Sequence, residues 1–254
     1  REAAQSAMCA AITGVTPEYG LLLEQNRAGD VLIQVEADVD SEYDYELLGY
    51  ITPKKMGQAY HCPVFNGLSK QTTSEQLMDL GTQLNIHGIV PMFHVVGVTP
   101  EAADVHTAFL GRKDPPVVTI TNEDLAQARA EISAGTGKAD FCILGCPHLT
   151  INQVGSIAKM LDGQQLAGQL YIFTSTSTKE LAQRMGYLDI IHKAGGEIVI
   201  NSCVDQPCWS HLYGMSGVTE SPKCAYYTKR WNMTFTVKSI PACIQSVLKG
   251  EIVS

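Results

Sequence analysis

The segment ADFCILGCPHLTINQVGSIAKML, residues 139–161, decides the fold class of this chain. Its first part, residues 139–144, is a short apolar run that predicts a β-strand. A turn of glycine, cysteine and proline follows, and residues 149–161 then carry apolar side chains at helical spacing. The segment therefore predicts a strand that leads directly into an α-helix.

The rest of the second half repeats this pattern of strand and helix. Further strands are predicted at residues 170–173, 197–200 and 233–237. Further helices are predicted at residues 178–194 and 239–249. Gly195 and Gly196 end the first of these helices, and the second starts with Ser239 as its cap and Pro241 in its first turn. Strands and helices in this order predict a parallel sheet with helices on its faces.

The first half of the chain shows the same alternation less cleanly. Helices are predicted at residues 3–13, 74–87, 99–110 and 122–133. Strands are predicted at residues 31–35, 89–96 and 117–120. We therefore predict an α/β fold of layered α/β/α units with largely parallel sheets. The first unit covers residues 1–135 and the second residues 136–254, with the boundary near the segment AGTGK, residues 134–138.

The composition excludes several classes of protein. Apolar residues make up 45% of the 254 residues and charged residues 17%, a balance typical of a globular protein and not of a disordered chain. The formal net charge of -8, with scattered lysines and arginines, gives no basic surface for nucleic acid or anionic lipid. No run approaches the roughly 20 apolar residues of a membrane span, and the first residues are too polar for a signal peptide. We expect a soluble, cytoplasmic protein without nucleic acid or membrane partners.

Cys146 is the first candidate functional residue, because it lies between the strand at residues 139–144 and the helix that follows. Backbone amides and the positive end of a helix lower the pKa of a thiol, which favours the thiolate that ligates iron or attacks an electrophile. The alternative is a turn with an incidental thiol, in which His148 caps the helix. The eight cysteines of the chain form no evident disulfide framework and no C-x-x-C pair, which argues against a zinc ribbon.

Cys203 is the second candidate, because it closes an Asn-Ser-Cys segment directly after the strand at residues 197–200. Strands of one parallel sheet end on the same side, so Cys146 and Cys203 are expected to face one site. Two thiolates in one crevice indicate a soft metal or an iron-sulfur cluster. Cys142, inside a strand, and Cys208, in a loop, fit this role less well.

Ser221 and Lys223 are candidate catalytic residues in the segment ESPKCAYY, residues 220–227, which is rich in hydrogen-bonding groups. A serine two residues from a lysine can serve as a base, because the ammonium favours loss of its proton. Alternatively, the pair can hold a carboxylate or a phosphate. Both roles suit an anionic substrate, whereas an exposed polar loop without a function is the remaining interpretation.

A third group of candidates, for substrate binding, lies mainly in the segment FHVVGVTPE, residues 93–101. The segment predicts a junction of strand, turn and helix, where His94, Thr99 and Glu101 are candidates together with His148. A lone histidine on an apolar strand is more often a buried core residue with its hydrogen bonds satisfied.

Taken together, these strings resemble aconitase X, the divergent branch of the aconitase superfamily. The shared strings are AAITGVTPEYG (10–20), FHVVGVTPEA (93–102), LGCPHL (144–149), Asn-Ser-Cys (201–203) and Ser-x-Lys (221–223), and they follow the family's order. The resemblance spans nearly the whole chain. Its two longest strings are specific, whereas Ser-x-Lys alone would mean little.

The resemblance implies a fold, a reaction and a cofactor. Members of the family dehydrate cis-3-hydroxy-L-proline or mevalonate 5-phosphate with an iron-sulfur cluster held by three cysteines. The resemblance therefore implies an aconitase iron-sulfur-domain-like fold, with Cys146 and Cys203 as two of the ligands. The third cysteine is expected before Arg1, since the chain lacks an initiator methionine and is expected to start inside a longer protein. The family's small swivelling domain or subunit is an expected partner, and we expect it to lie outside residues 1–254.

We therefore expect a hydro-lyase, a carbon-oxygen lyase that removes water from a small hydroxy-carboxylate. The first choice of substrate is cis-3-hydroxy-L-proline and the second is mevalonate 5-phosphate, whereas a non-catalytic iron-binding or redox module is a third interpretation. In the dehydratase hypothesis, iron held by the two cysteines acts as a Lewis acid on the hydroxyl group. Ser221 is the candidate base, and Lys223 binds the substrate anion or tunes that base.

Two positions depart from the family pattern. Val15 stands where the family usually has arginine, and Asn201-Ser202 stand where it usually has Asp-Thr. The second change lies beside a proposed metal ligand, where it can alter the hydrogen bonds that tune the metal.

Overall fold

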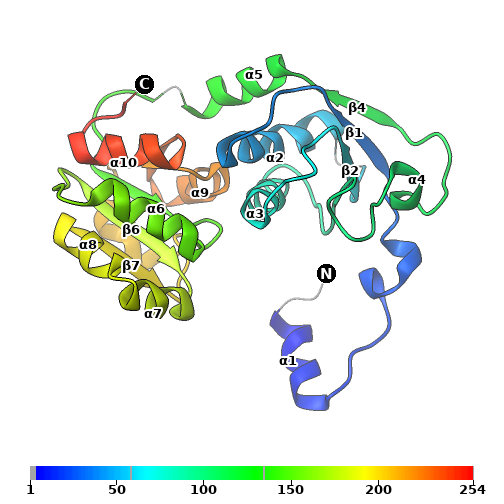
Figure 1. Ribbon diagram of the computed structural model, residues 1–254, viewed down its shortest axis with the longest axis horizontal. Coiled ribbons are helices and arrows are strands. Elements are labelled where there is room, and N and C mark those ends of the chain that lie inside the picture. The colour runs from blue at the N-terminus through cyan, green and yellow to red at the C-terminus, as the bar shows by residue number, and fades with distance from the viewer. Residues whose placement is uncertain (1–3, 58, 134, 254) are drawn as a thin grey trace.

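Most of the chain forms two α/β units, each built on a sheet of parallel strands, in the computed structural model (Figure 1). The structure describes residues 4–57, 59–133 and 135–253. The first sheet takes its strands from residues 31–120 and the second from residues 141–237. This arrangement confirms the predicted α/β fold with parallel sheets and flanking helices. The predicted boundary at residues 134–138 includes residue 134, which lies outside the described residues.

The first unit has a four-stranded sheet in the order β3-β2-β1-β4. Its strands are β1 (Val31–Val35), β2 (Pro63–Asn66), β3 (His94–Val95) and β4 (Val117–Ile120). Its helices are α2 (Glu42–Met56), α3 (Ser74–Gln83), α4 (Val105–Ala108) and α5 (Asn122–Ser133). Ser41 and Thr73 begin α2 and α3 with complete capping boxes, which fix where both helices start. Apolar side chains of the sheet and of α2, α3 and α5 form the core of this unit.

The second unit has a five-stranded sheet in the order β7-β6-β5-β8-β9. Its strands are β5 (Phe141–Leu144), β6 (Gln169–Thr174), β7 (Gly196–Ile200), β8 (Ser216–Thr219) and β9 (Thr234–Val237). Its helices are α6 (Ile151–Leu161), α7 (Thr176–Arg184), α8 (Tyr187–Ala194), α9 (Pro222–Thr228) and α10 (Ile240–Lys249).

Strand β5 lies in the middle of the second sheet and is buried along its whole length. Cys142 and Leu144 pack into the core under α6, α8 and α10. Phe141 and Ile143 point to the opposite face and pack near Trp209. Because both faces are covered, the strand is an uninterrupted apolar run, which is why the sequence predicts it clearly.

The two units are joined by hydrogen bonds between side chains and the backbone. The hydroxyl groups of Tyr43 and Ser133 both donate to the Val237 carbonyl, at 3.2 and 2.6 Å. Helices α2 and α3 of the first unit both contact α9 of the second. The carboxyl edge of the second sheet and the α2–α3 pair therefore meet, and the candidate site described below lies at this junction.

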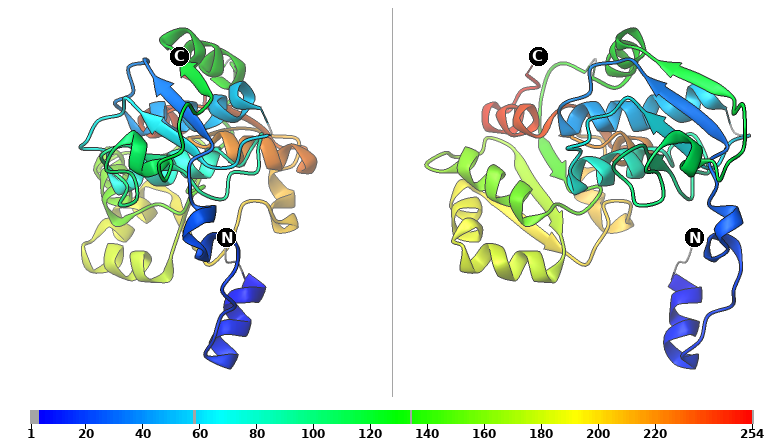
Figure 2. Two further views of the ribbon diagram at one scale, coloured as in Figure 1. Left: turned by 90° about the vertical axis from the view of Figure 1, so that its right-hand side faces the viewer. Right: turned by 45° about the vertical axis from the view of Figure 1, so that its right-hand side comes forward.

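Helix α1 (Ala4–Thr13) lies apart from both units (Figure 2). Its Met8 and Ile12 side chains are exposed. The helix predicted at residues 3–13 is confirmed from Ala4 onward, and residue 3 lies outside the described residues. None of the helices in the described ranges combines the length and the apolar character that crossing a membrane requires.

The helix predicted at residues 178–194 is wrong as a single element, because the chain forms α7 and α8 there. Gly186 separates the two helices and adopts φ 77°, a left-handed conformation that favours glycine. Apolar side chains keep helical spacing on both sides of the break, so periodicity alone does not reveal it.

Two predicted elements of the first unit are much shorter than expected. The strand predicted at residues 89–96 contains only β3, since Pro91 lacks a backbone N–H and Ile89 is exposed. The helix predicted at residues 99–110 contains only α4. The hydroxyl of Ser239 makes no capping hydrogen bond to α10, although Pro241 lies in the first turn as predicted.

The sequence reading missed α2, β2, β8 and α9. Helix α2 is buried through most of its length, so its sequence lacks the polar face that marks an amphipathic helix. Strand β8 has the sequence SGVT, and Phe141 packs directly over its Gly217. A strand with so few large apolar side chains gives almost no sequence signal.

Candidate active site

Three loops that follow parallel strands gather at the carboxyl edge of the second sheet. Cys146 follows β5, Cys203 follows β7, and Glu220 follows β8 directly. All strands of this sheet are parallel, so their carboxyl ends point to the same side. The loops place two thiols and a buried carboxyl group near one another, as the strand order predicts for the two thiols.

The turn at residues 145–147, here called the cysteine turn, depends on Gly145. This residue adopts φ 112°, and a Cβ atom there would lie 2.3 Å from the carbonyl oxygen of Phe173. The backbone N–H groups of Gly145 and Cys146 then donate to Glu220 Oε1, at 2.6 and 3.2 Å. The Glu220 carboxyl group therefore holds the cysteine turn by its backbone.

The Cys146 thiol is partly exposed, and the environment raises its pKa to about 11. Burial is the main cause of this rise; a hydrogen bond from Ser221 and the charge of Lys223 oppose it, whereas Glu220 and Cys203 add to it. The prediction that this turn by itself favours a thiolate is therefore wrong, because desolvation outweighs the amides. A metal cation bound at the sulfur would favour the thiolate.

Cys203 is close enough to Cys146 to affect its pKa through charge. Cys203 is exposed and lines an open hollow of about 510 Å³. Residues 201–203 and 206–208 line this hollow, which therefore also exposes Cys208. The two thiols proposed from the sequence thus lie at one accessible edge and not in separate cores.

His148 connects the two cysteine loops. Its Nε2 atom lies 2.9 Å from the carbonyl oxygen of Ser202, next to Cys203. The alternative in which His148 caps the following helix is wrong, because Thr150 caps α6 and forms a capping box with Gln153. His148 is therefore placed to hold the loop after β7 beside the loop after β5.

Ser221 is fully buried at the start of α9, where its Oγ atom accepts from the backbone N–H of Cys224 at 3.2 Å. The same oxygen accepts from Gln83 Nε2 at 3.3 Å, and the hydroxyl donates to the Cys146 sulfur. Gln83 belongs to the first unit, and its Oε1 accepts from the backbone N–H of Lys223 at 2.9 Å. The hydroxyl of Ser221 thus uses its full hydrogen-bonding capacity.

The residues predicted from the segment at positions 93–101 lie in the first unit. His94 is buried, with Nε2 2.7 Å from the carbonyl oxygen of Arg27. Glu101 forms an ion pair with Arg27 at 2.9 Å, and Thr99 bonds the backbone of Val95. Within the described residues, no hydrogen bond or ion pair joins His94, Thr99 or Glu101 to the cysteine turn. Their role in substrate binding stays a prediction.

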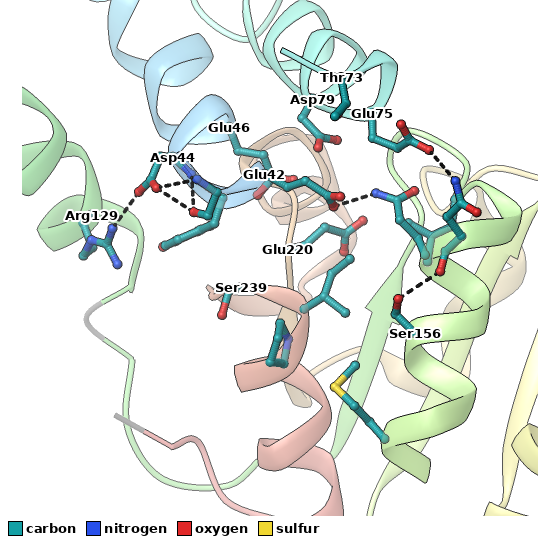
Figure 3. A pocket seen from close by; sticks show the side chains of 18 residues that line it. Glu42, Asp44, Glu46, Thr73, Glu75, Asp79, Arg129, Ser156, Glu220 and Ser239 are labelled. Atoms are coloured by element: carbon teal, nitrogen blue, oxygen red, sulfur yellow. Dashed lines mark hydrogen bonds and ion pairs between the residues drawn. The ribbon is translucent and has the colours of Figure 1, made fainter. Parts of the chain in front are cut away.

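A cavity of about 780 Å³ lies between the two units and reaches Glu220. Figure 3 shows acidic side chains from both units gathered in it. The acidic residues in its lining are Glu42, Asp44, Glu46, Glu75, Asp79 and Glu220. The sequence reading missed this group. Its signal is the pair of acidic residues four positions apart on each of α2 and α3, Glu42/Glu46 and Glu75/Asp79, since such like-charged pairs destabilise an isolated helix.

Two family models match the chain, one for each unit. The model described as "Aconitase X second domain" matches residues 29–130, and that described as "Aconitase X third domain" matches residues 139–249. The crystal structure of Thermococcus kodakaraensis aconitase X in its holo-form superposes with a TM-score of 0.83 at 31% identity. The superposition covers 97% of this chain and 62% of that structure.

Named relatives of the chain are dehydratases with two different substrates. The phosphomevalonate dehydratase large subunit of Methanothermobacter thermautotrophicus is 36% identical over 89% of this chain and 55% of its own length. The cis-3-hydroxy-L-proline dehydratase of Pseudomonas aeruginosa is 33% identical over 79% of this chain and 36% of its own length. The chain thus spans about half of the first relative and a smaller share of the second.

Proposed function

Because the chain belongs to the aconitase X family, we propose that the complete protein is a hydro-lyase that removes water from a small hydroxy-carboxylate. The observation that carries this proposal is the gathering of Cys146, Cys203, Ser221 and Lys223 at one sheet edge. Named relatives of both substrate types are dehydratases, which supports the reaction class.

An iron-sulfur cluster is the cofactor that these residues fit. The sulfur atoms of Cys146 and Cys203 are soft ligands of the kind that iron prefers, and both belong to loops at the accessible edge of the sheet. A bound cluster supplies a Lewis acid that polarises the departing hydroxyl group. Residues 4–57, 59–133 and 135–253 contain no group of three metal-binding side chains, so we propose that a further cysteine comes from elsewhere in the complete protein.

Lys223 is our candidate for binding the substrate carboxylate. It lies in the first turn of α9, directly after Pro222, and its backbone N–H donates to Gln83. Its charge acts at the Cys146 sulfur, so an anion bound by its ammonium group would lie beside the proposed iron ligand. The ammonium would also stabilise the negative charge that develops on the carboxylate as the neighbouring proton leaves.

Ser221 fits a positioning role better than the role of base suggested by the sequence. Its buried oxygen already accepts two hydrogen bonds, and its proton points to the Cys146 sulfur. A base needs a free lone pair directed at the proton that it removes. We therefore propose that Ser221 orients the Cys146 sulfur and supports its negative charge.

We propose cis-3-hydroxy-L-proline as the substrate and mevalonate 5-phosphate as the second choice. A phosphate group needs several basic side chains or amides around it. Of the four residues gathered at the sheet edge, Cys146, Cys203, Ser221 and Lys223, one is basic. A substrate whose anionic group is a carboxylate fits a single ammonium group better than a phosphate ester does.

A small partner subunit or domain is part of the proposal. Matched relatives such as that of Methanothermobacter thermautotrophicus are named large subunits, which implies that a smaller subunit accompanies them. We propose that a swivelling domain of the aconitase type covers the carboxyl edge of the second sheet and completes the site.

The test uses the complete protein with its small partner, reconstituted with iron and sulfide. Cys146→Ser and Cys203→Ser are each expected to reduce bound iron and turnover by more than about a hundredfold, since each removes a ligand. Cys208→Ser is the matched control, because Cys208 is exposed in the same hollow as Cys203. Both substrates are assayed in parallel.

The outcomes separate the alternatives clearly. Turnover of one substrate that is lost in both ligand variants but kept in the control supports the proposal. Unchanged iron content and turnover in Cys146→Ser and Cys203→Ser would contradict it. Iron that is bound without turnover of either substrate would instead favour a non-catalytic iron-binding or redox module.

A further inference from the structure

Four carboxyl groups from both units converge inside the cavity between them. Glu42 and Glu46 come from α2, Asp79 comes from α3, and Glu220 follows β8. Figure 3 shows these four side chains directed toward one another in the middle of the cavity. Like charges gathered in this way are costly unless they are protonated or paired with a cation.

Two of the four carboxyl groups have oxygen atoms with no partner. Glu46 is 2% exposed and Asp79 is 4% exposed, so both side chains are almost fully buried. Glu46 Oε2 and Asp79 Oδ2 make no hydrogen bond. Because the great majority of buried polar atoms in proteins are hydrogen-bonded, each such exception requires an explanation, and a missing ligand is one.

The other two carboxyl groups are already held by the protein. Glu42 Oε2 accepts from Gln153 Nε2 at 2.8 Å, a bond between the two units. Glu220 Oε1 accepts from the amides of the cysteine turn. These bonds fix the frame of the cavity, so the free oxygen atoms of Glu46 and Asp79 remain as its available acceptors.

The pKa values of Asp79 and Glu46 also agree with a cavity that can take up a cation. Burial, followed by the charges of Glu42, Glu220 and Glu75, raises the pKa of Asp79 to about 8. Burial and then the charge of Asp79 raise the pKa of Glu46 well above its ordinary value. With nothing bound, Asp79 therefore holds a proton at neutral pH that a cation would displace.

Part of the remaining wall is apolar and indicates what carries the cation, whereas the rest is polar and includes Arg129, which pairs with Asp44. The apolar part, on the side of the second unit, is lined by Leu149, Met160, Ile240 and Pro241. The volume of about 780 Å³ lies within the range of small-molecule sites in proteins. Since the described residues contain no preformed metal-binding group, an organic cation fits this cavity better than a metal ion.

We propose that the cavity between the units binds an organic cation, an ammonium group on a small aliphatic or cyclic body. The free oxygen atoms of Glu46 and Asp79 accept hydrogen bonds from the ammonium group, and the body packs on the apolar wall. The ring ammonium of a cyclic amino-acid substrate is one source of this cation, and a separate amine is the other. Binding itself does not depend on the proposed dehydration.

The experiment measures binding to the complete protein by isothermal titration calorimetry. The probes are pyrrolidine, which is a cation at neutral pH, and cyclopentanecarboxylate, which has a ring of the same size but carries a negative charge. We expect pyrrolidine to bind and cyclopentanecarboxylate not to bind at this site. Titrations in buffers with different heats of ionisation should show that pyrrolidine binding releases protons.

The variants locate the binding site. Asp79→Asn and Glu46→Gln should each weaken pyrrolidine binding by about tenfold or more, the loss of one charge-assisted hydrogen bond. Asp162→Asn, which removes an exposed carboxylate at the end of α6, is the matched control and should bind normally. Thermal unfolding of each variant shows that it is folded. Both cavity variants replace a buried carboxyl group by an amide of nearly the same size, so neither is expected to unfold.

Two results would overturn the proposal: equal binding of both probes, or pyrrolidine binding that Asp79→Asn and Glu46→Gln leave unchanged. The source of the cation follows from competition. If cis-3-hydroxy-L-proline displaces pyrrolidine, the substrate is the source of the cation. If this amino acid leaves pyrrolidine binding unaffected, the source is a separate amine. Both outcomes support the site. Failure of dehydration does not affect this measurement, so the two proposals fail separately.

Discussion

The cysteine turn and the acidic cavity share Glu220 but differ in how their buried polar groups are satisfied. In the turn, the N–H groups of Gly145 and Cys146 both have an acceptor. In the cavity, Glu46 and Asp79 each keep an oxygen atom without a partner. A satisfied turn keeps its shape without a ligand, whereas an unsatisfied cavity becomes more stable when something binds. The cysteine turn is therefore held in one conformation by its own hydrogen bonds, whereas the cavity has acceptor atoms free for a ligand.

The largest effect on stability is expected when the carboxyl group of Glu220, which both regions share, is removed. Glu220→Ala leaves the buried N–H of Gly145 and the partly buried N–H of Cys146 without an acceptor, at about 1–3 kcal/mol for the buried group and less for the other. The relief of repulsion with Asp79 and Glu46 offsets part of this cost, so we expect a net loss of roughly 2 kcal/mol in the free energy of unfolding. Urea denaturation of the complete protein measures it.

Glu220→Gln is the matched control for that change. The amide oxygen of glutamine can still accept from the cysteine turn, while the charge that faces Asp79 is gone. We expect stability equal to or above that of the unaltered protein, and retention of bound iron. If Glu220→Ala were as stable as Glu220→Gln, the carboxyl group would not hold the turn.

The pH dependence of stability tests the cavity, because ionisation of Asp79 should destabilise the folded protein. Asp79 has a folded-state pKa of about 8, raised mainly by burial, so the folded protein holds a proton that the unfolded chain releases. The stability from this proton is fully present below the ordinary pKa of aspartate and is lost as pH rises through about 8.

Asp79→Asn should remove this dependence. We expect the variant to exceed the unaltered protein in unfolding free energy by at least about 1 kcal/mol on the alkaline side, with a smaller difference in acid. Chemical denaturation across the pH range measures this difference. Asp162→Asn controls for the change in net charge, and a parallel shift of both variants at every pH would refute the assignment to the cavity.

The substitution His148→Ala is expected to have the smallest effect on the free energy of unfolding. His148→Ala removes the contact with the Ser202 carbonyl at an exposed position, so the unfolding free energy should change by about 0.5 kcal/mol or less. Bound iron should nevertheless decrease severalfold, since the two cysteine loops lose their link. Iron analysis after dialysis measures this loss, and His192→Ala on α8, also exposed, is the control. An equal loss of iron in both variants would show that the link is not specific.

The comparison also explains what the sequence could and could not predict. Strand β5 and the turn after it were predictable, because a strand covered on both faces is apolar throughout and parallel strands end on one side. The acidic cavity was not, since Glu46 and Asp79 acquire their environment from packing between helix α2, helix α3 and the other unit. Helix α2 lacked an amphipathic pattern for the same reason. The contact between Ser221 and Cys146 could not be predicted either, because β8, the strand that leads to Ser221, has too few large apolar side chains to be recognised in the sequence.

Gln83 gives the interface between the units a further consequence. One side-chain amide, rooted in α3, contacts Ser221 Oγ and the backbone of Lys223 in the other half of the molecule. A hinge motion between the halves would have to release both contacts together. The placement of one unit against the other is therefore tied, through Gln83, to the hydroxyl group that donates to the Cys146 sulfur.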